Sequence, residues 1–187
     1  MPQNKLIQTC EELLSLYSGG ATFCSFDTET TGLNSKKNHV VEIGAVKFNN
    51  KGVTGTFNVL INPGCAMPPE ATRVNNITDE MLKECPLVEQ VLPDFIEFIG
   101  ESILVAHNVG FDLKFINAEL ERSGMHHLKN KVVDTLRLSK SMFPDMPNHK
   151  LQTLAYKLGI QALQAHRAQD DARVCMELFL QCLTDIH

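Results

Sequence analysis

The spacing of apolar and polar positions predicts both strands and helices along the chain. Five short apolar runs predict strands. They span about residues 21–28, 39–48, 54–61, 102–106 and 132–133. Asn49–Gly52 is typical of a turn, so we expect the first three strands to form an antiparallel meander. The run at 102–106 is wholly apolar, which indicates a strand buried on both faces of a sheet.

Apolar residues recur at helical spacing in six longer stretches. These span about residues 3–17, 87–99, 112–122, 134–142, 150–158 and 168–184. Thr78 and Asp134 are of the residue types that cap helix N-termini, and Gly159 is typical of a helix end. Pro93 is expected to begin or kink its helix, and the proline-rich residues 62–70 are expected to form a loop.

The order of these elements predicts one α/β domain with a mixed, five-stranded sheet flanked by helices. A length of 187 residues, with 43% hydrophobic and 21% charged residues, is typical of one globular domain. We therefore expect residues 1–187 to form a single domain, with residues 1–20 as an N-terminal helical extension.

No apolar run reaches the length of about 20 residues that a membrane span needs. The first five residues are not followed by the apolar stretch of a secretory signal, so we expect no membrane association. The six cysteines are scattered, without the close pairs of a zinc site. Free thiols of this kind are typical of a cytoplasmic protein.

The formal net charge is −5, which argues against a simple basic nucleic-acid-binding module. Residues 1–100 carry 7 basic and 12 acidic side chains, whereas residues 101–187 carry 10 of each. A polyanionic ligand would therefore need metal ions or a local basic patch.

Asp27 and Glu29 stand at the end of the first predicted strand. Side chains alternate along a strand, so the two carboxylates point to the same face, about 7 Å apart along the backbone. Two like charges that leave an apolar strand together destabilise a fold unless a cation lies between them. An exposed pair at the start of a loop is the alternative.

Other acidic and basic residues stand at the ends of predicted elements. Asp112 begins a helix, and the run from His166 to Asp171 leads into the last one. Taken singly, an Asp in the first turn of a helix is usually explained by the helix dipole. Glu42 interrupts the apolar run of the second strand, and we interpret it as an edge or capping carboxylate.

Together these residues form three ordered motifs, DxETTGL, HNxxFD and HRAxxDA, which begin at Asp27, His107 and His166. The set resembles the DEDDh, or DnaQ-like, family of 3′→5′ exonucleases, and covers nearly the whole chain from about residue 22. Within that family it is most similar to the proofreading exonucleases of bacterial replicative polymerases, of the epsilon and PolC types. The resemblance implies an RNase H-like fold.

The acidic residues of the motifs are suited to binding metal ions. Asp27, Glu29, Asp112 and Asp171 bring four negative charges, which two divalent cations would balance. Carboxylate ligands suit Mg²⁺ or Mn²⁺ better than zinc. Two such ions can activate a water and stabilise the leaving oxygen of a phosphodiester, and His166 could take the proton of the water.

The resemblance implies a division of roles among these residues. Asp27 would bridge both ions, Glu29 and Asp171 would hold the ion on the side of the nucleophile, and Asp112 would support the other. The choice of Asp171 over Asp170 follows the family spacing from the histidine, and Asp170 is expected to be a solvated carboxylate in the first helical turn.

The resemblance also implies contacts with the substrate. The turn Thr30, Thr31 and Gly32 would receive the 3′-terminal nucleotide, and Leu33 would wedge against its base. The further candidates are Val74, Asn75, Asn108 and Phe111. Relatives often carry a histidine where Asn75 stands, which makes its contact a departure from the family pattern. His107 is interpreted as support for its loop.

The predicted function is that of a metal-dependent 3′→5′ exonuclease that trims single-stranded DNA ends and releases nucleoside 5′-monophosphates. Proofreading would require a DNA polymerase subunit as partner, whereas a repair nuclease could act alone. One alternative is the same chemistry on RNA, as in the oligoribonuclease and RNase T branches. Another is an inactive polymerase-accessory binding module, although such proteins usually lose one of the acidic residues.

Overall fold

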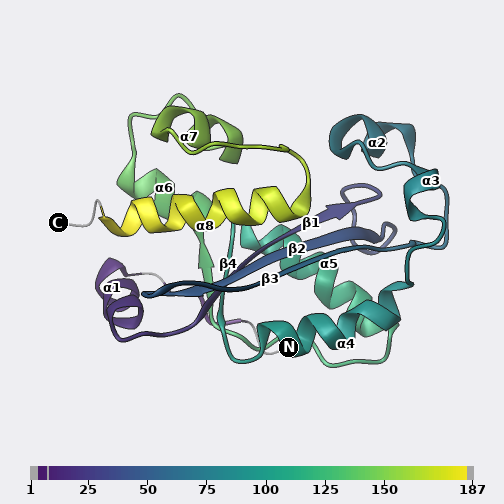
Figure 1. The fold of residues 1–187 in the computed structure, drawn as a ribbon, viewed down its shortest axis with the longest axis horizontal. Helices are drawn as coiled ribbons and strands as arrows, with labels where there is room; N and C mark the ends of the chain where they lie inside the picture. Colours follow the sequence, from purple (N-terminus) through teal and green to yellow (C-terminus); the bar gives the residue numbers. More distant parts are fainter. Residues whose placement is uncertain (1–3, 8, 185–187) are drawn as a thin grey trace.

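The computed structural model describes residues 4–7 and 9–184, which form a mixed sheet between helices (Figure 1). The strands are β1 (Phe23–Thr30), β2 (Val40–Asn49), β3 (Gly52–Leu60), β4 (Ile103–Ala106) and β5 (Val132–Asp134). Their order across the sheet is β3-β2-β1-β4-β5. β2 pairs antiparallel with β1 and β3, while β4 pairs parallel with β1 and β5. The predicted fold class and all five strands are confirmed.

The helices cover both faces of this sheet. They are α1 (Cys10–Ser18), α2 (Pro69–Asn75), α3 (Asp79–Leu82), α4 (Val88–Ile99), α5 (Val109–Arg122), α6 (Thr135–Met142), α7 (Leu151–Leu158) and α8 (Ala168–Thr184). In Figure 1, α8 runs along one face and α4 and α5 lie on the other.

Alternating residues of β1 belong to different hydrophobic cores. Cys24 and Phe26 are buried in the cluster that includes residues of α4 and α5. Phe23 is buried in the opposite cluster, where its ring centroid lies 5.1 Å from that of Phe179 in α8. Odd-numbered residues of β1 therefore face α8, and this alternation carries Asp27 and Glu29 to the α8 side of the sheet.

The predicted helix over 3–17 is correct only in its second half. The backbone N–H of Ile7 donates to Val132, and that of Val132 donates to Lys5, so this segment extends β5 as a parallel bridge. The helix begins at Cys10, after Thr9, whose side chain accepts from the Glu12 N–H. The remaining residues of the prediction, 3 and 8, lie outside the described part of the chain.

The structure bears out the predicted helix ends. The side chains of Thr78 and Asp134 accept hydrogen bonds from the N–H groups of Met81 and Leu136. Gly159 ends α7 with a φ of 73°, a left-handed conformation that glycine adopts without strain. Pro93 lies inside α4. Residues 69 and 70, which were expected in a loop, are instead the first two residues of α2.

A glycine allows α8 to approach the sheet. A Cβ atom on Gly44 of β2 would lie 2.1 Å from the carbonyl carbon of Ala168, the first residue of α8. Any side chain at this position would push the start of α8 away from the strands. Because Asp171 lies in the first turn of α8, this contact also sets its distance from β1.

We predict that Gly44→Ala lowers the free energy of unfolding by about 3 kcal/mol, because the added methyl group cannot fit without backbone movement. Urea denaturation would measure this change. Gly110→Ala is the matched control, since a Cβ there meets no atom within 4 Å and the residue lies in a helix. A Gly44→Ala variant as stable as the control would contradict the proposed contact.

Candidate active site

Three carboxylates meet where β1 ends and α8 begins. Asp27 and Glu29 project from β1, and Asp171 projects from the first turn of α8. One potential ligand atom from each of the three lies within 4.8 Å of the others. Residues separated by more than 140 positions in the sequence thus form one acidic cluster, as the motifs predicted.

Asp112 approaches this cluster from the first turn of α5. It is 3% exposed, and its Oδ1 accepts hydrogen bonds from the N–H of Thr28 at 3.0 Å and from the Thr28 hydroxyl at 2.8 Å. Thr28 stands between Asp27 and Glu29, so these bonds fix Asp112 against the strand that carries the other two acids. No sequence motif had singled out this role of Thr28.

The acidic cluster is electrostatically strained. Burial raises the pKa of Asp27 well above its ordinary value, and the neighbouring carboxylate of Asp112 raises it further. Burial also raises the pKa of Glu29 to about 8 and that of Asp112 to about 7. Four acids with raised pKa values, Asp171 included, indicate a site in which ionised carboxylates lack a compensating positive charge.

The donor set fits divalent metal ions. Asp27, Glu29 and Asp171 offer only carboxylate oxygens, the ligands that Mg²⁺ and Mn²⁺ prefer. No cysteine or histidine belongs to this group among the residues that the structure describes. The site therefore has the chemistry of a magnesium or manganese centre and not that of a structural zinc site.

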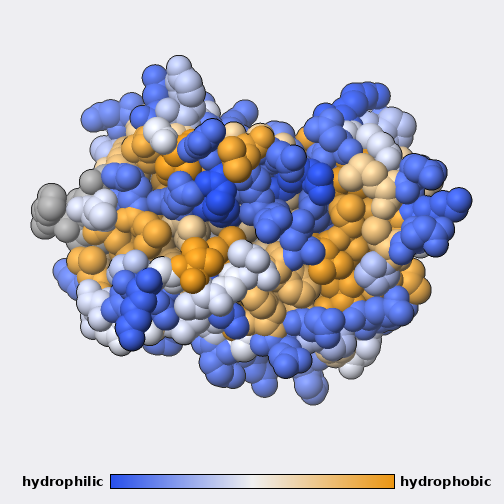
Figure 2. Space-filling model, in the orientation of Figure 1, coloured by the Kyte–Doolittle hydropathy of each residue, from blue (hydrophilic) through white to orange (hydrophobic). Residues whose placement is uncertain are grey.

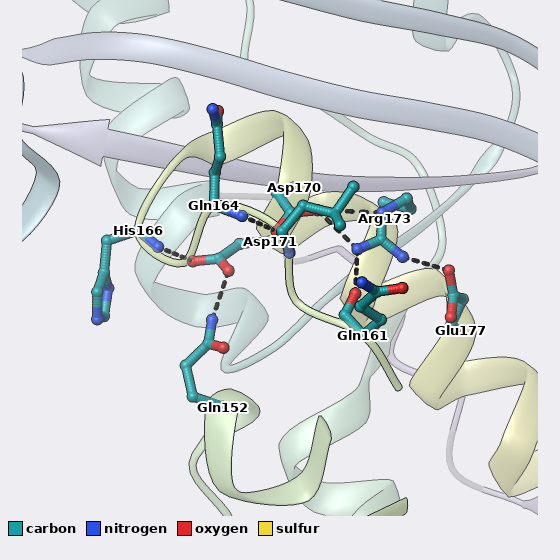
Figure 3. Close-up of polar contacts among 9 residues, drawn as sticks. Gln152, Gln161, Gln164, His166, Asp170, Asp171, Arg173 and Glu177 are labelled. Carbon is teal, nitrogen blue, oxygen red and sulfur yellow. Dashed lines mark hydrogen bonds and ion pairs between the residues drawn. The ribbon is translucent and has the colours of Figure 1, made fainter. Parts of the chain in front are cut away.

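Hydrogen bonds orient Asp171 (Figure 3). Its Oδ1 accepts from the side-chain amide of Gln152 in α7 at 2.6 Å, and its Oδ2 accepts from the backbone N–H of His166 at 3.1 Å. The imidazole of His166 extends away from the carboxylate in this view, and the residue is exposed. Gln152 was not predicted as a site residue, because nothing in its own segment indicates a partner in another helix.

The expectation of a solvated Asp170 is wrong. The residue is 9% exposed, and its Oδ2 accepts from the backbone N–H groups of Leu163 and Gln164, both at 2.6 Å. Its Oδ1 accepts from Arg173 in the next turn of α8 (Figure 3). These bonds and the charge of Arg173 outweigh the cost of burial, so the pKa of Asp170 is lowered.

Glu42 is a capping carboxylate, as one part of its interpretation held, but it is not at an edge. β2 lies between β3 and β1, and Glu42 is fully buried. Its oxygens accept from Arg167 at 2.8 and 3.0 Å and from the N–H of Ala168 at 3.1 Å. The carboxylate therefore holds the residue after His166 and the N-terminus of α8 against the sheet.

The turn after β1 is closed by local hydrogen bonds. The Thr30 hydroxyl donates to the carbonyl of Gly32 at 2.7 Å, and the Thr31 hydroxyl accepts from the N–H of His39 at 3.0 Å. A Cβ on Gly32 would lie 2.8 Å from the Asn38 side chain, which explains the glycine. Leu33 is 86% exposed, so its side chain is available for contact beside the acidic cluster.

Val74 and Asn75, at the end of α2, have opposite environments. Val74 is 54% exposed, whereas Asn75 is 1% exposed. The Asn75 amide donates to the Thr30 carbonyl at 3.5 Å, its oxygen accepts from the Ile77 N–H at 3.1 Å, and its hydrogen bond to Glu29 counteracts the raised pKa of that acid. This burial favours support of the turn over direct contact with a ligand.

Asn108 and Phe111 lie at the start of α5. Asn108 has a φ of 70°, and its N–H donates to the Asp134 carboxylate at 3.0 Å. The Phe111 ring packs against Phe115, with centroids 4.9 Å apart. His107 makes hydrogen bonds of 3.0 Å with the Thr135 hydroxyl and 2.7 Å with the His149 carbonyl, consistent with its interpretation as a supporting residue.

Another buried carboxylate, Glu119, anchors the loop between β1 and β2. Glu119 of α5 is 1% exposed, and its Oε1 accepts from the Val40 N–H at 3.1 Å and from Arg122 at 2.9 Å. The His39 ring lies 3.2 Å from the same oxygen. Arg122 also donates to the Ser35 carbonyl, so Glu119 and Arg122 bind the loop to α5.

Figure 2 shows that the outline of the molecule is notched between the lobes formed by α7 and α2. Hydrophilic residues gather over the first half of α8 in this view.

None of the helices in the described part of the chain has the length and apolar character that crossing a bilayer requires.

The sheet order and the acids at the end of β1 define the class of the protein, an α/β protein of the RNase H-like fold with a nuclease-type acidic site. A family model described as "Exonuclease" matches residues 24–179, so the chain belongs to this exonuclease family. It is a 3′→5′ exonuclease of the DnaQ type, a family whose members depend on divalent metal ions.

Curated relatives resemble the chain over most of its length. The epsilon subunit of DNA polymerase III from Treponema pallidum (strain Nichols) is 47% identical over 159 residues, which cover 84% of this chain and 74% of that protein. A PolC-type DNA polymerase III from Caldanaerobacter subterraneus subsp. tengcongensis is 41% identical over 161 residues, or 86% of this chain. The match covers only 11% of the PolC-type protein.

Solved structures share the fold at lower identity. Exonuclease X in complex with 5′ overhanging duplex DNA has a TM-score of 0.71 and 22% identity, with 88% of this chain and 92% of that one covered. A 3′-exonuclease that recognises the 3′ end of histone mRNA stem-loop has a TM-score of 0.76 and 17% identity, with 89% and 83% covered.

The strained acids predict how the stability of the metal-free protein depends on pH. The pKa of Glu29 rises from 4.5 in the unfolded chain to about 8 in the fold, so the folded state binds more protons between these values. In EDTA, the free energy of unfolding is therefore expected to fall as the pH rises from 5 to 8, a loss that Glu29→Gln reduces. Chemical denaturation at each pH measures both, and a Glu29→Gln variant with an unchanged pH dependence would contradict the assignment.

Proposed function

We propose that the protein is a proofreading or repair exonuclease that hydrolyses the terminal phosphodiester of single-stranded DNA and releases nucleoside 5′-monophosphates. The observation that carries this proposal is the acidic cluster of Asp27, Glu29 and Asp171, which lies beside the turn from Thr30 to Leu33. The large core clusters on the opposite faces of one sheet also support a single exonuclease domain over residues 1–187.

Asp27, Glu29, Asp112 and Asp171 hold two divalent cations, Mg²⁺ or Mn²⁺, in this proposal. When bound, such ions would supply positive charge to the scissile phosphate and would lower the pKa of an attacking water. Their binding would favour the ionised forms of the four acids, whose pKa values burial raises. Thr28 and Gln152 support the ligands, because their hydrogen bonds orient Asp112 and Asp171.

His166 acts as the general base, with an imidazole nitrogen that takes the proton of the attacking water. Support comes from its place directly before α8, where its N–H is bound to Asp171 while its ring remains exposed. A base within hydrogen-bond reach of the water contributes a rate factor of about 10² to 10⁴.

The 3′-terminal nucleotide binds at the turn Thr30, Thr31 and Gly32, with Leu33 against its base. The high exposure of Leu33 and Val74 supports contact with an apolar base face. Phe111, which is partly buried at the start of α5, is the further apolar candidate. Asn75 and Asn108 act through the backbone that they hold, since Asn75 is buried and Asn108 fixes the start of α5.

DNA is the favoured substrate because the relatives that match over most of this chain are named as DNA polymerase III proteins. By the same reasoning, a DNA polymerase is the proposed partner, which would place the protein in the cytoplasm. Exoribonuclease activity is the second candidate, since a 3′-exonuclease of histone mRNA shares the fold. An inactive accessory module is disfavoured by the presence of all four acids and the histidine.

We expect the protein to degrade a 5′-labelled single-stranded DNA oligonucleotide from its 3′ end in Mg²⁺ or Mn²⁺ and to leave it intact in EDTA. A gel ladder measures this, with an RNA oligonucleotide of the same sequence as the comparison and Asp27→Ala as the inactive control. Degradation that persists in EDTA would overturn the metal mechanism. Strong preference for the RNA would overturn the DNA assignment.

We expect His166→Ala to lower the single-turnover rate by about 100-fold or more, because the water loses its proton acceptor. The affinity for Mn²⁺, measured by calorimetric titration, should stay within about twofold, since the histidine is not a ligand in this proposal. Equal losses of rate and of Mn²⁺ binding would show that the residue acts on the metal site.

A further inference from the structure

The segment between α7 and α8 carries His166 and has no helix or strand of its own. We call residues 161–167 the histidine loop. A loop without regular hydrogen bonds does not by itself hold a side chain in a reactive position. Within the loop the Arg167 N–H donates to the Gln164 carbonyl at 3.2 Å. Bonds from neighbouring elements add to this turn and restrain the position of His166.

Asp170 supplies two of those bonds. Its Oδ2 accepts from the N–H groups of Leu163 and Gln164, each at 2.6 Å. Arg173 extends the same contact, because its guanidinium donates to Asp170 Oδ1 at 2.7 and 3.0 Å and also to the carbonyl of Gln161 (Figure 3). One ion pair on α8 thus binds three backbone groups at the start of the histidine loop.

The backbone of His166 itself needs such restraint. Its φ of 62° lies in the left-handed region, a backbone conformation that residues other than glycine adopt at a cost in free energy. Conformations of this kind persist where the surroundings determine them, often at functional sites. Asp170 holds the chain before His166, and Glu42 holds Arg167 directly after it.

We propose that Asp170 is a positioning residue for the reaction, which acts by fixing the histidine loop so that the backbone of His166 stays bound to Asp171 and its imidazole starts from a fixed place beside the acidic cluster. The proposal rests on the proposed role of His166 as general base. Asp170 is not part of the acidic cluster, and its oxygens are directed to the histidine loop and to Arg173. In this proposal, its contribution to the rate passes through His166 and not through the neighbouring Asp171.

The test is a double-mutant cycle in the full chain, measured as single-turnover hydrolysis of 5′-labelled single-stranded DNA with saturating Mg²⁺. Asp170→Ala should lower the rate about tenfold in the native background, because a displacement of about 1 Å can cost up to 10²-fold. In the His166→Ala background, the same change should alter the rate by less than about twofold. Affinity for Mn²⁺ should be the same with and without Asp170→Ala.

Equal losses in both backgrounds would overturn the proposal, because Asp170 would then act on the fold or on the metal site. No loss in the native background would overturn it too. If His166→Ala alone leaves the rate unchanged, the general-base role fails and Asp170 has nothing to position. Failure of the general-base role can be told apart from failure of the Asp170 proposal, because the former is read from the single His166→Ala variant.

Arg173→Ala keeps the test decisive if Asp170→Ala does not fold, because it releases the Gln161 carbonyl and the charge that holds Asp170. It should also lower the rate only while His166 is present. Gln169→Ala and Glu177→Gln are the matched controls. The first changes an exposed neighbour in the same turn, and the second changes the other carboxylate bound to Arg173. Both should leave the rate within about twofold of the native protein.

Discussion

Repulsion among carboxylates at the end of β1 is the constraint on which the rest of the structure depends. Asp27 and Glu29 share one face of a strand, and α8 brings a carboxylate oxygen of Asp171 within 4.8 Å of an oxygen of each. The neighbouring helix N-termini reduce the free-energy cost of this repulsion without cancelling it. Asp112 and Asp171 each lie in the first turn of a helix, where the partial positive charge of the N-terminus favours an anion. The fold thus keeps an incomplete charge balance that is suited to cations.

The site is assembled by elements that contact one another closely. Gly44 lets the start of α8 lie directly on β2, and Glu42 then binds Arg167 and the first N–H of α8. Because these contacts involve backbone, they leave little freedom in the placement of Asp171. The acids and the helix that carries one of them are therefore positioned by the same packing that forms the core.

The sequence predicted what depends on local period and on ordered motifs, namely the five strands, the fold class and the acids that meet at β1. The sequence-based prediction failed for residues whose hydrogen-bond partners come together only in the folded chain. The roles of Asp170 and Glu42 depend on arginines and loop N–H groups that only the folded chain brings near. Helix α2 was missed because Pro68 and Pro69 were interpreted as loop residues, although proline is favoured in the first turn of a helix. Helical spacing near Leu6 was overruled by pairing with β5.

The Glu119 contacts have a mechanical consequence. Glu119 and Arg122 tie the loop between β1 and β2 to the second half of α5, while the first turn of the same helix carries Asp112. The loop that follows the turn Thr30–Gly32 is thus held by the same helix that carries Asp112. A shift of the loop would therefore either break these bonds or move the helix that carries Asp112.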